Sequence, residues 1–453
     1  PLESVILGPG DQVLLKRGEV FGRRLTLRGS GDADAWVTIG AYGDHTLPKP
    51  VIRLKKAPDD IAIVFEDIAE GHPSGLTLSY IRFEQLSIQK ARLGIYLRMM
   101  QSEDNRGITI TDCDFTDIYC DSIYQKMYNE DGSYNEQGVT EELSAIKGNL
   151  SWVGGGQYFK EGGGGQEYLH PAAIFIGGKP ISVDARKESS KPRLQELTVQ
   201  DCTFLECNTG VGSTFYWPHP GTKGDNVYKS IIRYFRMSDC VLTGAVNGIL
   251  SFDSLDGGAV ENGSRPDDEG WGLVERVRVV GGSSLKTVWP LGTTGAFLSN
   301  SQHLLIRNSE FSYVNNNGAP DGCGLDFETN CNDITVEDSV FTGNDGQAIL
   351  VMDGGSFGPH RNITIQNNLF CANLLNPMNE RYQYDICIWN EGNRNLSIRG
   401  NVAYYQPKTP KSDYKGLYGP ITKGVTSRSN KRYPTGETED IKDVIRPYTA
   451  FTI

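Results

Sequence analysis

Residues 321–370 read DGCGLDFETNCNDITVEDSVFTGNDGQAILVMDGGSFGPHRNITIQNNLF, and this stretch holds the unit from which most of the chain is built. Two short apolar strands lie within it at 334–336 and 348–352, and the same pattern returns at 363–365. A unit of this length, with a few short strands and polar turns, cannot bury an apolar face alone and must stack on its neighbours. The stretch therefore predicts a β-solenoid.

One short motif identifies the repeat. Apolar residues alternate with other residues, and Asp, Asn or Gly then precedes a small residue at the sixth position, as in ITVEDSVF and ITIQNNLF. The sixth position falls at Cys113, Cys202, Cys240, Ser309, Ser339, Asn368 and Asn401, with weaker copies at Leu86 and Gly282. Successive copies lie roughly 30 residues apart where no insertion intervenes. Because small polar side chains at a sharp turn can bond the backbone of the next coil, we expect a ladder that points inward there.

A second strand of the repeat precedes the longer loops, and its clearest copies are GLDFET at 324, AILVMD at 348 and DICIWN at 385. Successive side chains of a strand point to opposite faces. This alternation buries Leu325 and Phe327 and turns Asp326 and Glu328 outward. Together with the two strands that flank the ladder turn, it predicts a coil of three strands.

The repeat resembles the right-handed parallel β-helix proteins of the pectin-lyase-like group of carbohydrate-active enzymes. The likeness covers about residues 8–403, and it includes the opening GPGDQVLLKRGEVFGRRLTLRGSG. The resemblance implies an all-β, right-handed, single-stranded parallel β-helix over residues 1–403, with an insertion at about 120–170 and other long loops beside one strand column. Residues 404–453 are expected to form a C-terminal tail that packs on the helix or caps it.

In that group the turn with the ladder joins the second and third strands, and the strand after this turn forms the face where carbohydrate is cleaved. By motif, this face is the column that contains Ile95, Ile174, Ile249, Leu325, Ile349 and Ile386. The resemblance implies a fold and leaves the reaction open, since one fold supports many functions.

Composition limits the classes of function. The formal net charge of −12 disfavours nucleic acid as a partner and provides no overall attraction for a polyanionic glycan. No apolar run is long enough to span a membrane. The chain begins at Pro1 without a signal peptide, as a mature secreted protein would, so we expect a secreted or periplasmic location. Nothing in the sequence indicates the oligomeric state.

The nine cysteines show no metal-ligand spacing. Those of the ladder column are explained as small buried residues. A disulfide between Cys323 and Cys331, or between Cys202 and Cys207, stays open, and the odd count leaves at least one thiol free or paired elsewhere.

Carboxylates are the main chemical signal. Asp326 and Glu328 leave the same face of one strand, and Asp353 ends the corresponding strand one coil later. Stacked acids repel one another, which raises at least one pKa. A pair with separated pKa values is what glycoside hydrolysis uses, with one protonated acid and one carboxylate as nucleophile or base. We therefore predict Asp326, Glu328 and Asp353 as catalytic residues.

These acids have a structural alternative, because Asp is common in solenoid turns and a turn of this kind can bind calcium. Hydrolysis itself requires no cofactor, and no metal ligand is assigned. Candidate substrate-binding residues occupy the loops around the predicted face: Asp253, Tyr216, Trp217, His219, Lys286, His360 and Trp389. The insertion adds Tyr158, Lys160, Tyr168 and His170 as candidates for a wall of the same groove.

Three classes of function remain open. A glycoside hydrolase acting on a polysaccharide or oligosaccharide is favoured by the acid cluster with its flanking aromatic residues. A polysaccharide lyase is the runner-up: β-elimination at a uronate needs a base and a group that neutralises the carboxylate, and the candidates are scattered over several coils at Lys286, His219, Tyr216, Arg98 and His170. A non-catalytic glycan-binding β-helix is third.

Overall fold

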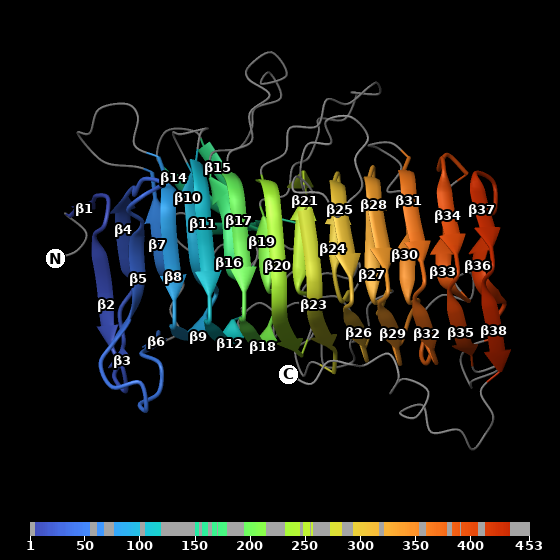
Figure 1. Cartoon of the computed structure of the whole chain (residues 1–453), viewed down its shortest axis with the longest axis horizontal. Helices are drawn as coiled ribbons and strands as arrows, with labels where there is room; N and C mark the ends of the chain where they lie inside the picture. Colours follow the sequence, from blue (N-terminus) through green and yellow to red (C-terminus); the bar gives the residue numbers. More distant parts are fainter. Residues whose placement is uncertain are drawn as a thin grey trace, which may run out of the picture. The chain divides into compact units, whose positions relative to one another are not determined.

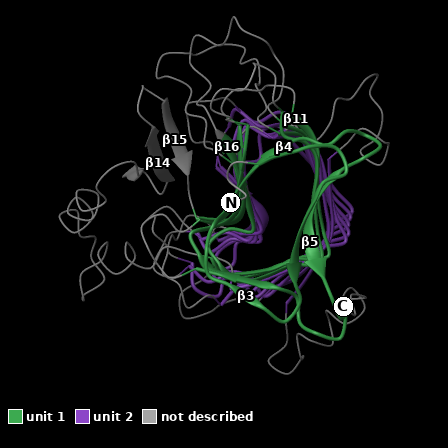
Figure 2. Cartoon of the chain, turned by 90° about the vertical axis from the view of Figure 1, so that its left-hand side faces the viewer, with its two compact units in different colours: residues 1–217, 229–233 green, residues 218–228, 234–453 purple. Residues whose placement is uncertain are grey.

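A computed structural model of the chain describes most of the repeat. The described residues are 5–54, 61–67, 77–99, 105–118, 150–153, 156–161, 165–169, 171–178, 194–213, 232–244, 248–253, 255–256, 272–282, 293–316, 321–352, 359–377, 383–389, 391–405 and 413–434. The chain divides into two compact units, one formed by 1–217 with 229–233 and one by 218–228 with 234–453 (Figure 2).

Each coil of the first unit supplies one strand to each of three columns. The first column contains β1 (Ile6–Leu7), β4 (Leu25–Gly29), β7 (Ile61–Glu66), β10 (Leu93–Met99), β16 (Ala172–Gly178) and β19 (Val211–Ser213). The second contains β2 (Gln12–Lys16), β5 (Val37–Tyr42), β8 (Ser79–Glu84), β11 (Asn105–Thr111) and β17 (Leu194–Gln200). The third contains β3 (Val20–Phe21), β6 (Val51–Arg53), β9 (Ser87–Ala91), β12 (Asp114–Ile118) and β18 (Thr203–Cys207). Neighbours in each column pair in parallel, as β7 with β10 and β8 with β11 do.

The second unit repeats this plan. Its first column contains β21 (Leu250–Asp253), β24 (Phe297–Ser299), β27 (Leu325–Thr329), β30 (Ile349–Val351), β33 (Tyr384–Ile388) and β36 (Gly416–Pro420). The long strands β20 (Ile232–Thr243) and β23 (Gly272–Val280) run through the second and third columns. The second column continues with β25 (Gln302–Arg307), β28 (Asn332–Glu337), β31 (Arg361–Gln366), β34 (Leu396–Arg399) and β37 (Val425–Arg428). The third continues with β26 (Glu310–Ser312), β29 (Val340–Thr342), β32 (Leu369–Cys371), β35 (Val402–Tyr405) and β38 (Lys431–Pro434).

Corresponding strands of successive coils lie side by side, as β25, β28 and β31 do in Figure 1. Their register aligns Ile334 with Ile363, so equivalent apolar positions stack. The short strand β22 (Leu255–Asp256) pairs with β25. The prediction of an all-β parallel β-helix is confirmed.

The predicted insertion contains a sheet of its own. Strands β13 (Leu150–Val153), β14 (Gly156–Glu161) and β15 (Gly165–Leu169) pair in antiparallel fashion. This pairing differs from that of the coils, which shows that the segment is an addition to the repeat.

The ladder turn explains the motif by which the repeat is recognised. Its fifth position has positive φ in every described copy, as at Asp201 (52°), Asp338 (48°) and Asn367 (56°). Asp and Asn tolerate this left-handed conformation better than most residues, and Gly adopts it without strain, which explains their place in the motif. Arg276, at 50°, is an exception that the motif did not include.

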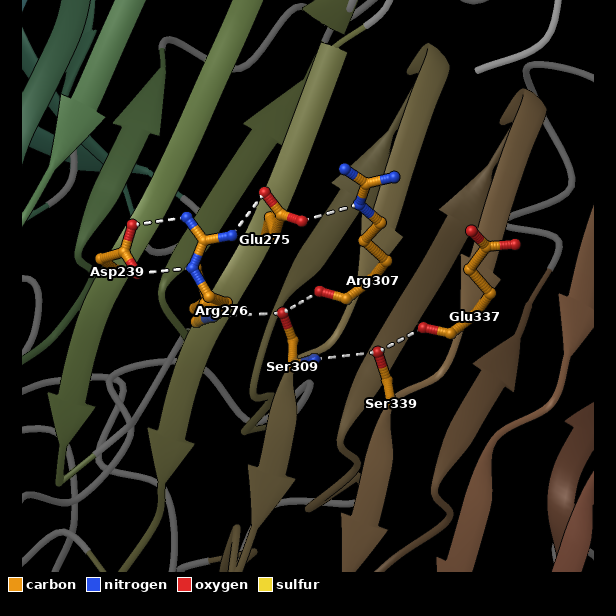
Figure 3. Close-up of polar contacts among 8 residues, drawn as sticks. Asp239, Glu275, Arg276, Arg307, Ser309, Glu337 and Ser339 are labelled. Atoms are coloured by element: carbon orange, nitrogen blue, oxygen red, sulfur yellow. Dashed lines mark hydrogen bonds and ion pairs between the residues drawn. The ribbon is translucent and has the colours of Figure 1, made fainter. Parts of the chain in front are cut away.

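The sixth position forms the expected ladder. The backbone N–H of Ser309 donates to Oγ of Ser339 (3.1 Å), and the N–H of Ser339 donates to Oδ1 of Asn368 (3.0 Å). The N–H of Asn368 in turn donates to Oδ1 of Asn401 (2.9 Å). Figure 3 shows the step between the two serines. In the coil before Ser309 the column is occupied by Val277, which pairs with Cys240, so the assignment of Gly282 to this column was wrong.

The coil continues past residue 403, where the sequence pattern weakens. Strands β36, β37 and β38 pair in parallel with β33, β34 and β35. Asn430 extends the ladder, because its Oδ1 accepts the N–H of Asn401 (2.9 Å). The repeat is therefore one coil longer than expected, while residues 435–453 of the predicted tail lie outside the described part of the chain.

The interior of the second unit contains a stack of aromatic rings. Phe311, Phe341 and Phe370 occupy equivalent positions on β26, β29 and β32, with ring centroids 5.1 and 5.5 Å apart. All three are buried. Leu325 and Phe327 are also fully buried, as the alternation predicted. Burial of these side chains provides most of the energy that holds coils together.

The outer face of the second column carries charge. Arg276 donates to both carboxylate oxygens of Asp239 (2.6 and 2.8 Å) and also contacts Glu275, which pairs with Arg307 (2.9 Å), as Figure 3 shows. The hydrogen bond from Arg276 lowers the pKa of Asp239. Exposed pairs of this kind contribute little stability each. They keep a broad β surface polar.

The cysteines are structural. Every cysteine that the structure describes is a buried free thiol, so neither of the two disulfides considered from the sequence is formed. In the ladder column, Sγ of Cys202 donates to the carbonyl of Ile110 on the preceding coil.

Candidate active site

The site centres on β27. Leu325 and Phe327 point into the core, so Asp326 lies on the opposite, outer face of the strand. Its register partners are Phe297 on β24 and Leu350 on β30. The first column of strands thus places a carboxyl group between two apolar side chains.

Glu328 follows in a β-bulge. β24 and β27 pair Leu298 with Phe327, and the next pair is Ser299 with Thr329, so Glu328 is the extra residue of β27. A bulge of this kind locally twists the strand and redirects side chains, and bulges are frequent beside active sites. The bulge therefore influences where Glu328 lies relative to Asp326, which regular strand alternation alone does not determine.

Asp326 is far less exposed than predicted. Its side chain was expected to face solvent, yet the residue is only 2% exposed. Among the described residues Oδ1 of Asp326 has no hydrogen-bond partner. A buried polar atom without a partner costs free energy in the folded state, and such atoms are uncommon in native proteins.

Burial and neighbouring charge keep this carboxyl group protonated. Burial raises the pKa of Asp326 well above its ordinary value, and the nearby carboxylates of Glu328 and Asp321 raise it further. Asp321 itself has a pKa raised to about 7, chiefly by burial and then by Glu328. Asp321 and Glu328 retain partial exposure. The three acids therefore comprise one buried, protonated carboxyl group and two at the more exposed edge.

Sequence reasoning missed Asp321. It lies in the turn that leads into β27, five residues before Asp326, where strand alternation says nothing about direction. Only its electrostatic influence on Asp326, together with its own raised pKa, places it in this group.

Apolar and sulfur-containing side chains surround the acids. Cys323, Leu350 and Cys387 form one buried cluster, with Met352 packed against it. After burial, the strongest influence on the pKa of the Cys323 thiol is the charge of Asp326, which raises it. The cluster thus adjoins the carboxyl groups and provides the low-dielectric surroundings that keep Asp326 neutral.

His360 does not belong to the site, which corrects its assignment as a substrate-binding residue. The side chain is completely buried, and its Nδ1 accepts the backbone N–H of Cys331 (3.1 Å). Its Nε2 contacts the carbonyl of Met352, and its ring packs against Phe327. His360 therefore joins neighbouring turns in the interior.

Trp389 is the one aromatic candidate whose surroundings are described. It directly follows β33 and lies two residues after Cys387, and it is half-buried. The backbone N–H of Trp389 donates to the backbone carbonyl of Val351 (3.0 Å). A role in substrate binding stays a prediction.

Most of the other candidates lie outside the described part of the chain. Asp353, Tyr216, Trp217, His219, Lys286 and His170 lie outside the described residues. The backbone of Asp253 ends β21, opposite Ser299 of β24, and its side chain is outside the description. Tyr158 and Lys160 lie on β14, and Tyr168 lies on β15.

Arg98 has a different environment from the one expected of a lyase residue. In the first unit it lies on β10, is almost fully buried, and pairs with Glu66 (3.0 Å). Glu66 also binds Arg28 (2.6 Å). This arrangement commits the guanidinium of Arg98 to a buried ion-pair network within the protein.

Within the described residues no group of His, Cys, Asp and Glu side chains is arranged to hold a metal ion. The same residues include no helix that could cross a membrane.

Comparison with known proteins agrees with the fold. A family model described as a right handed beta helix region matches residues 277–403. No curated protein matches the chain in sequence.

Solved structures of carbohydrate-active enzymes share the architecture. The GH136 lacto-N-biosidase from Eubacterium ramulus superposes with a TM-score of 0.55 at 15% identity, and the match covers 96% of this chain and 63% of that chain. DFA-IIIase from Arthrobacter chlorophenolicus without its lid gives 0.50 at 11% identity, covering 95% of this chain and 89% of that chain. Pectate lyase Pel9A gives 0.37 at 13% identity, covering 96% and 74%. The family match and the first two structures agree that the chain is a right-handed parallel β-helix, and the chain spans under two thirds of the lacto-N-biosidase.

Proposed function

We propose that this protein hydrolyses glycosidic bonds of a polysaccharide or oligosaccharide. The observation that carries the proposal is the pair formed by Asp326, buried and protonated on the outer face of β27, and Glu328, partly exposed in the adjacent bulge. Glycoside hydrolysis requires two carboxyl groups held in different protonation states by different surroundings.

Each residue has a role that follows from its surroundings. The protonated carboxyl group of Asp326 donates its proton to the glycosidic oxygen as the bond from that oxygen to the anomeric carbon breaks. Glu328 either attacks the anomeric carbon or removes a proton from the water that does so. The negative charge of Asp321 helps to keep the proton on Asp326. Asp353 remains a third candidate.

Fold-level analogy is consistent with this reaction and does not select it. Structures with TM-scores of at least 0.50 come from proteins named as a lacto-N-biosidase and a DFA-IIIase. The alternative, a polysaccharide lyase, depends on Lys286, His219, Tyr216 or His170, which lie outside the described residues. Because glycan polymers are met outside the cytoplasm, we also propose a secreted or periplasmic location.

A digest of neutral and uronate-containing glycans distinguishes these reactions. Hydrolysis releases new reducing ends without the ultraviolet absorbance of an unsaturated uronate, whereas a lyase produces that absorbance. Binding without any product would favour a glycan-binding β-helix.

The decisive variant is Asp326→Asn. Its amide has the shape of the carboxyl group but cannot transfer the proton, so kcat should fall by at least roughly 100-fold. The Tm should be unchanged or higher, because Asp326 must take up a proton when the chain folds, whereas the amide needs none. Asp338→Asn is the matched control, since Asp338 lies in a ladder turn at positive φ, which Asn tolerates equally. Full activity of Asp326→Asn would contradict the proposal.

A further inference from the structure

A second orphaned polar atom lies next to the acids. Thr294 is 4% exposed, and its Oγ1 is buried without a hydrogen-bond partner among the described residues. The preceding residue differs: Oγ1 of Thr293 donates to the carbonyl of Asn315 (2.5 Å). The lack of a partner is therefore particular to Thr294 and does not extend to the neighbouring threonine.

Backbone pairing places Thr294 beside the site. It forms a parallel bridge with Cys323, and the N–H of Gly295 donates to the carbonyl of Cys323 (2.9 Å). Residues directly opposite each other in a parallel pair point to the same face of the sheet, at the strand spacing of about 4.8 Å. Thr294 consequently lies on the face of Cys323.

Cys323 connects this position to the carboxyl groups. Its thiol belongs to the cluster with Leu350 and Cys387, and its pKa is raised, after burial, by the charges of Asp326 and Asp321. The bridge and β27 thus place two buried polar atoms near one thiol, Oγ1 of Thr294 and Oδ1 of Asp326, and neither atom has a hydrogen-bond partner among the described residues.

Each such atom destabilises the folded protein by about 1 to 3 kcal/mol if nothing bonds to it. Two within one candidate active site are explained if a substrate supplies the missing partners. A hydroxyl side chain can both donate and accept, which matches the hydroxyl groups of a sugar. The apolar cluster around Cys323 suits the C–H surface of an uncharged sugar ring.

We propose that Thr294 is a substrate-binding residue whose hydroxyl group bonds a hydroxyl of the neutral sugar residue bound next to Asp326. The inference rests on the proposed function for its setting, and it adds a specificity-determining contact for an uncharged sugar.

The test compares Thr294→Val and Thr294→Ser. Valine keeps the shape and removes the hydroxyl group, whereas serine keeps the hydroxyl group. Since the hydroxyl has no partner among the described residues, Thr294→Val should leave the Tm unchanged or raised. It should lower kcat/KM roughly tenfold, and Thr294→Ser should restore most of this loss.

Two control variants separate this effect from a general effect of losing a threonine. Thr293→Val should lower the Tm because it removes a formed hydrogen bond. Thr342→Val removes another buried hydroxyl that has no partner among the described residues, on β29 in the third column; it should leave the Tm unchanged or raised, as Thr294→Val does, and should not change kcat/KM.

Binding provides a second readout that does not depend on turnover. Affinities of wild type and Thr294→Val are measured by calorimetry for lacto-N-biose, an inulin oligosaccharide, oligogalacturonate and oligomannuronate. We expect a neutral probe to bind, and the variant to bind it roughly tenfold more weakly.

Several results would overturn the proposal. The first is a Thr294→Val variant whose Tm falls while its affinity and kcat/KM are unchanged, and the second is a variant in which none of these quantities changes. The third is a loss of both Tm and kcat/KM that Thr294→Ser does not reverse. The fourth is binding of the uronate probes alone. The proposed function fails separately, if Asp326→Asn remains active while Thr294→Val still weakens binding.

Discussion

At the residue scale, the carboxyl group of Asp326 combines two features that rarely occur together in a residue kept for stability alone. It is buried on the outer face of a strand, and one of its oxygens has no partner among the described residues. A protein that needed only stability would be better served by an apolar residue such as its register neighbour Leu350. Strongly perturbed carboxyl groups are typical of functional sites.

The role of Asp321 can be tested by the pH dependence of activity. Asp321→Asn removes a negative charge that raises the pKa of Asp326. Asp326 then loses its proton at lower pH, so the alkaline limb of the kcat/KM profile should move to lower pH. The measurement is the pH profile of this variant beside wild type and Asp338→Asn. An alkaline limb that stays in place in Asp321→Asn would show that Asp321 does not act on the catalytic acid.

At the element scale, the turns hold the coils in register through side-chain amides. Asn368 shows why asparagine suits the ladder: its Oδ1 accepts the N–H of Ser339, and its Nδ2 donates to the carbonyl of Val336 and to Oδ1 of Asn401. One amide thus satisfies backbone groups of one neighbouring coil and the ladder side chain of the other. Serine in this column makes fewer such bonds.

Removing this amide should be costly. Asn368→Ala leaves the N–H of Ser339 and the carbonyl of Val336 unbonded in the interior, which should lower the free energy of unfolding by roughly 2 to 4 kcal/mol. Denaturant titration measures the free energy of unfolding of the variant and of wild type. Asn395→Gly is the matched control, because Asn395 makes an exposed bond to Asn362 and has positive φ. An equal loss in both variants would contradict a special role for the ladder.

The last coil is held by a buried acid. Asp385 of β33 accepts hydrogen bonds from Asn373 (3.2 Å) and from the hydroxyl of Tyr414 (2.8 Å), which precedes β36. Burial raises the pKa of Asp385 to about 6 against the smaller lowering effects of these bonds and of Arg432. The contact therefore links attachment of the final coil to the protonation of one side chain.

This raised pKa predicts a pH-dependent stability with a definite sign. The native state holds the proton more tightly than the unfolded chain, so the contribution of Asp385 is complete below about pH 4 and is lost as pH rises through about 6. Its size is up to about 3 kcal/mol. In Asp385→Asn this part of the pH dependence of the Tm should disappear, whereas Asp413→Asn, an exposed neighbour of Tyr414, should preserve it. A rise in the wild-type Tm with pH that Asp385→Asn abolishes would contradict this sign.

At the scale of the whole molecule, net charge influences how readily the protein associates with charged glycans. The formal charge of −12 repels a polyuronate, and salt screens that repulsion. If a polyuronate is cleaved at all, kcat/KM on it should rise with added salt up to about 150 mM, while kcat/KM on a neutral glycan should stay constant. Initial rates at subsaturating substrate measure both. A rate on the polyuronate that falls with salt would reveal a local cationic binding site that outweighs the overall charge.

The sequence alone determined the coil, the inward ladder and the burial of Leu325 and Phe327, because these depend on strand alternation and on a motif that recurs at every turn. It also brought Asp326 and Glu328 together, since they share one strand. Only the tertiary structure decided the bulge at Glu328, the burial of Asp326, the participation of Asp321 and the interior place of His360. Each of these depends on the register and packing between coils, which join residues far apart in the chain. Local periodicity shows to which face of a strand a side chain points, and only the neighbouring coils determine whether that side chain is covered.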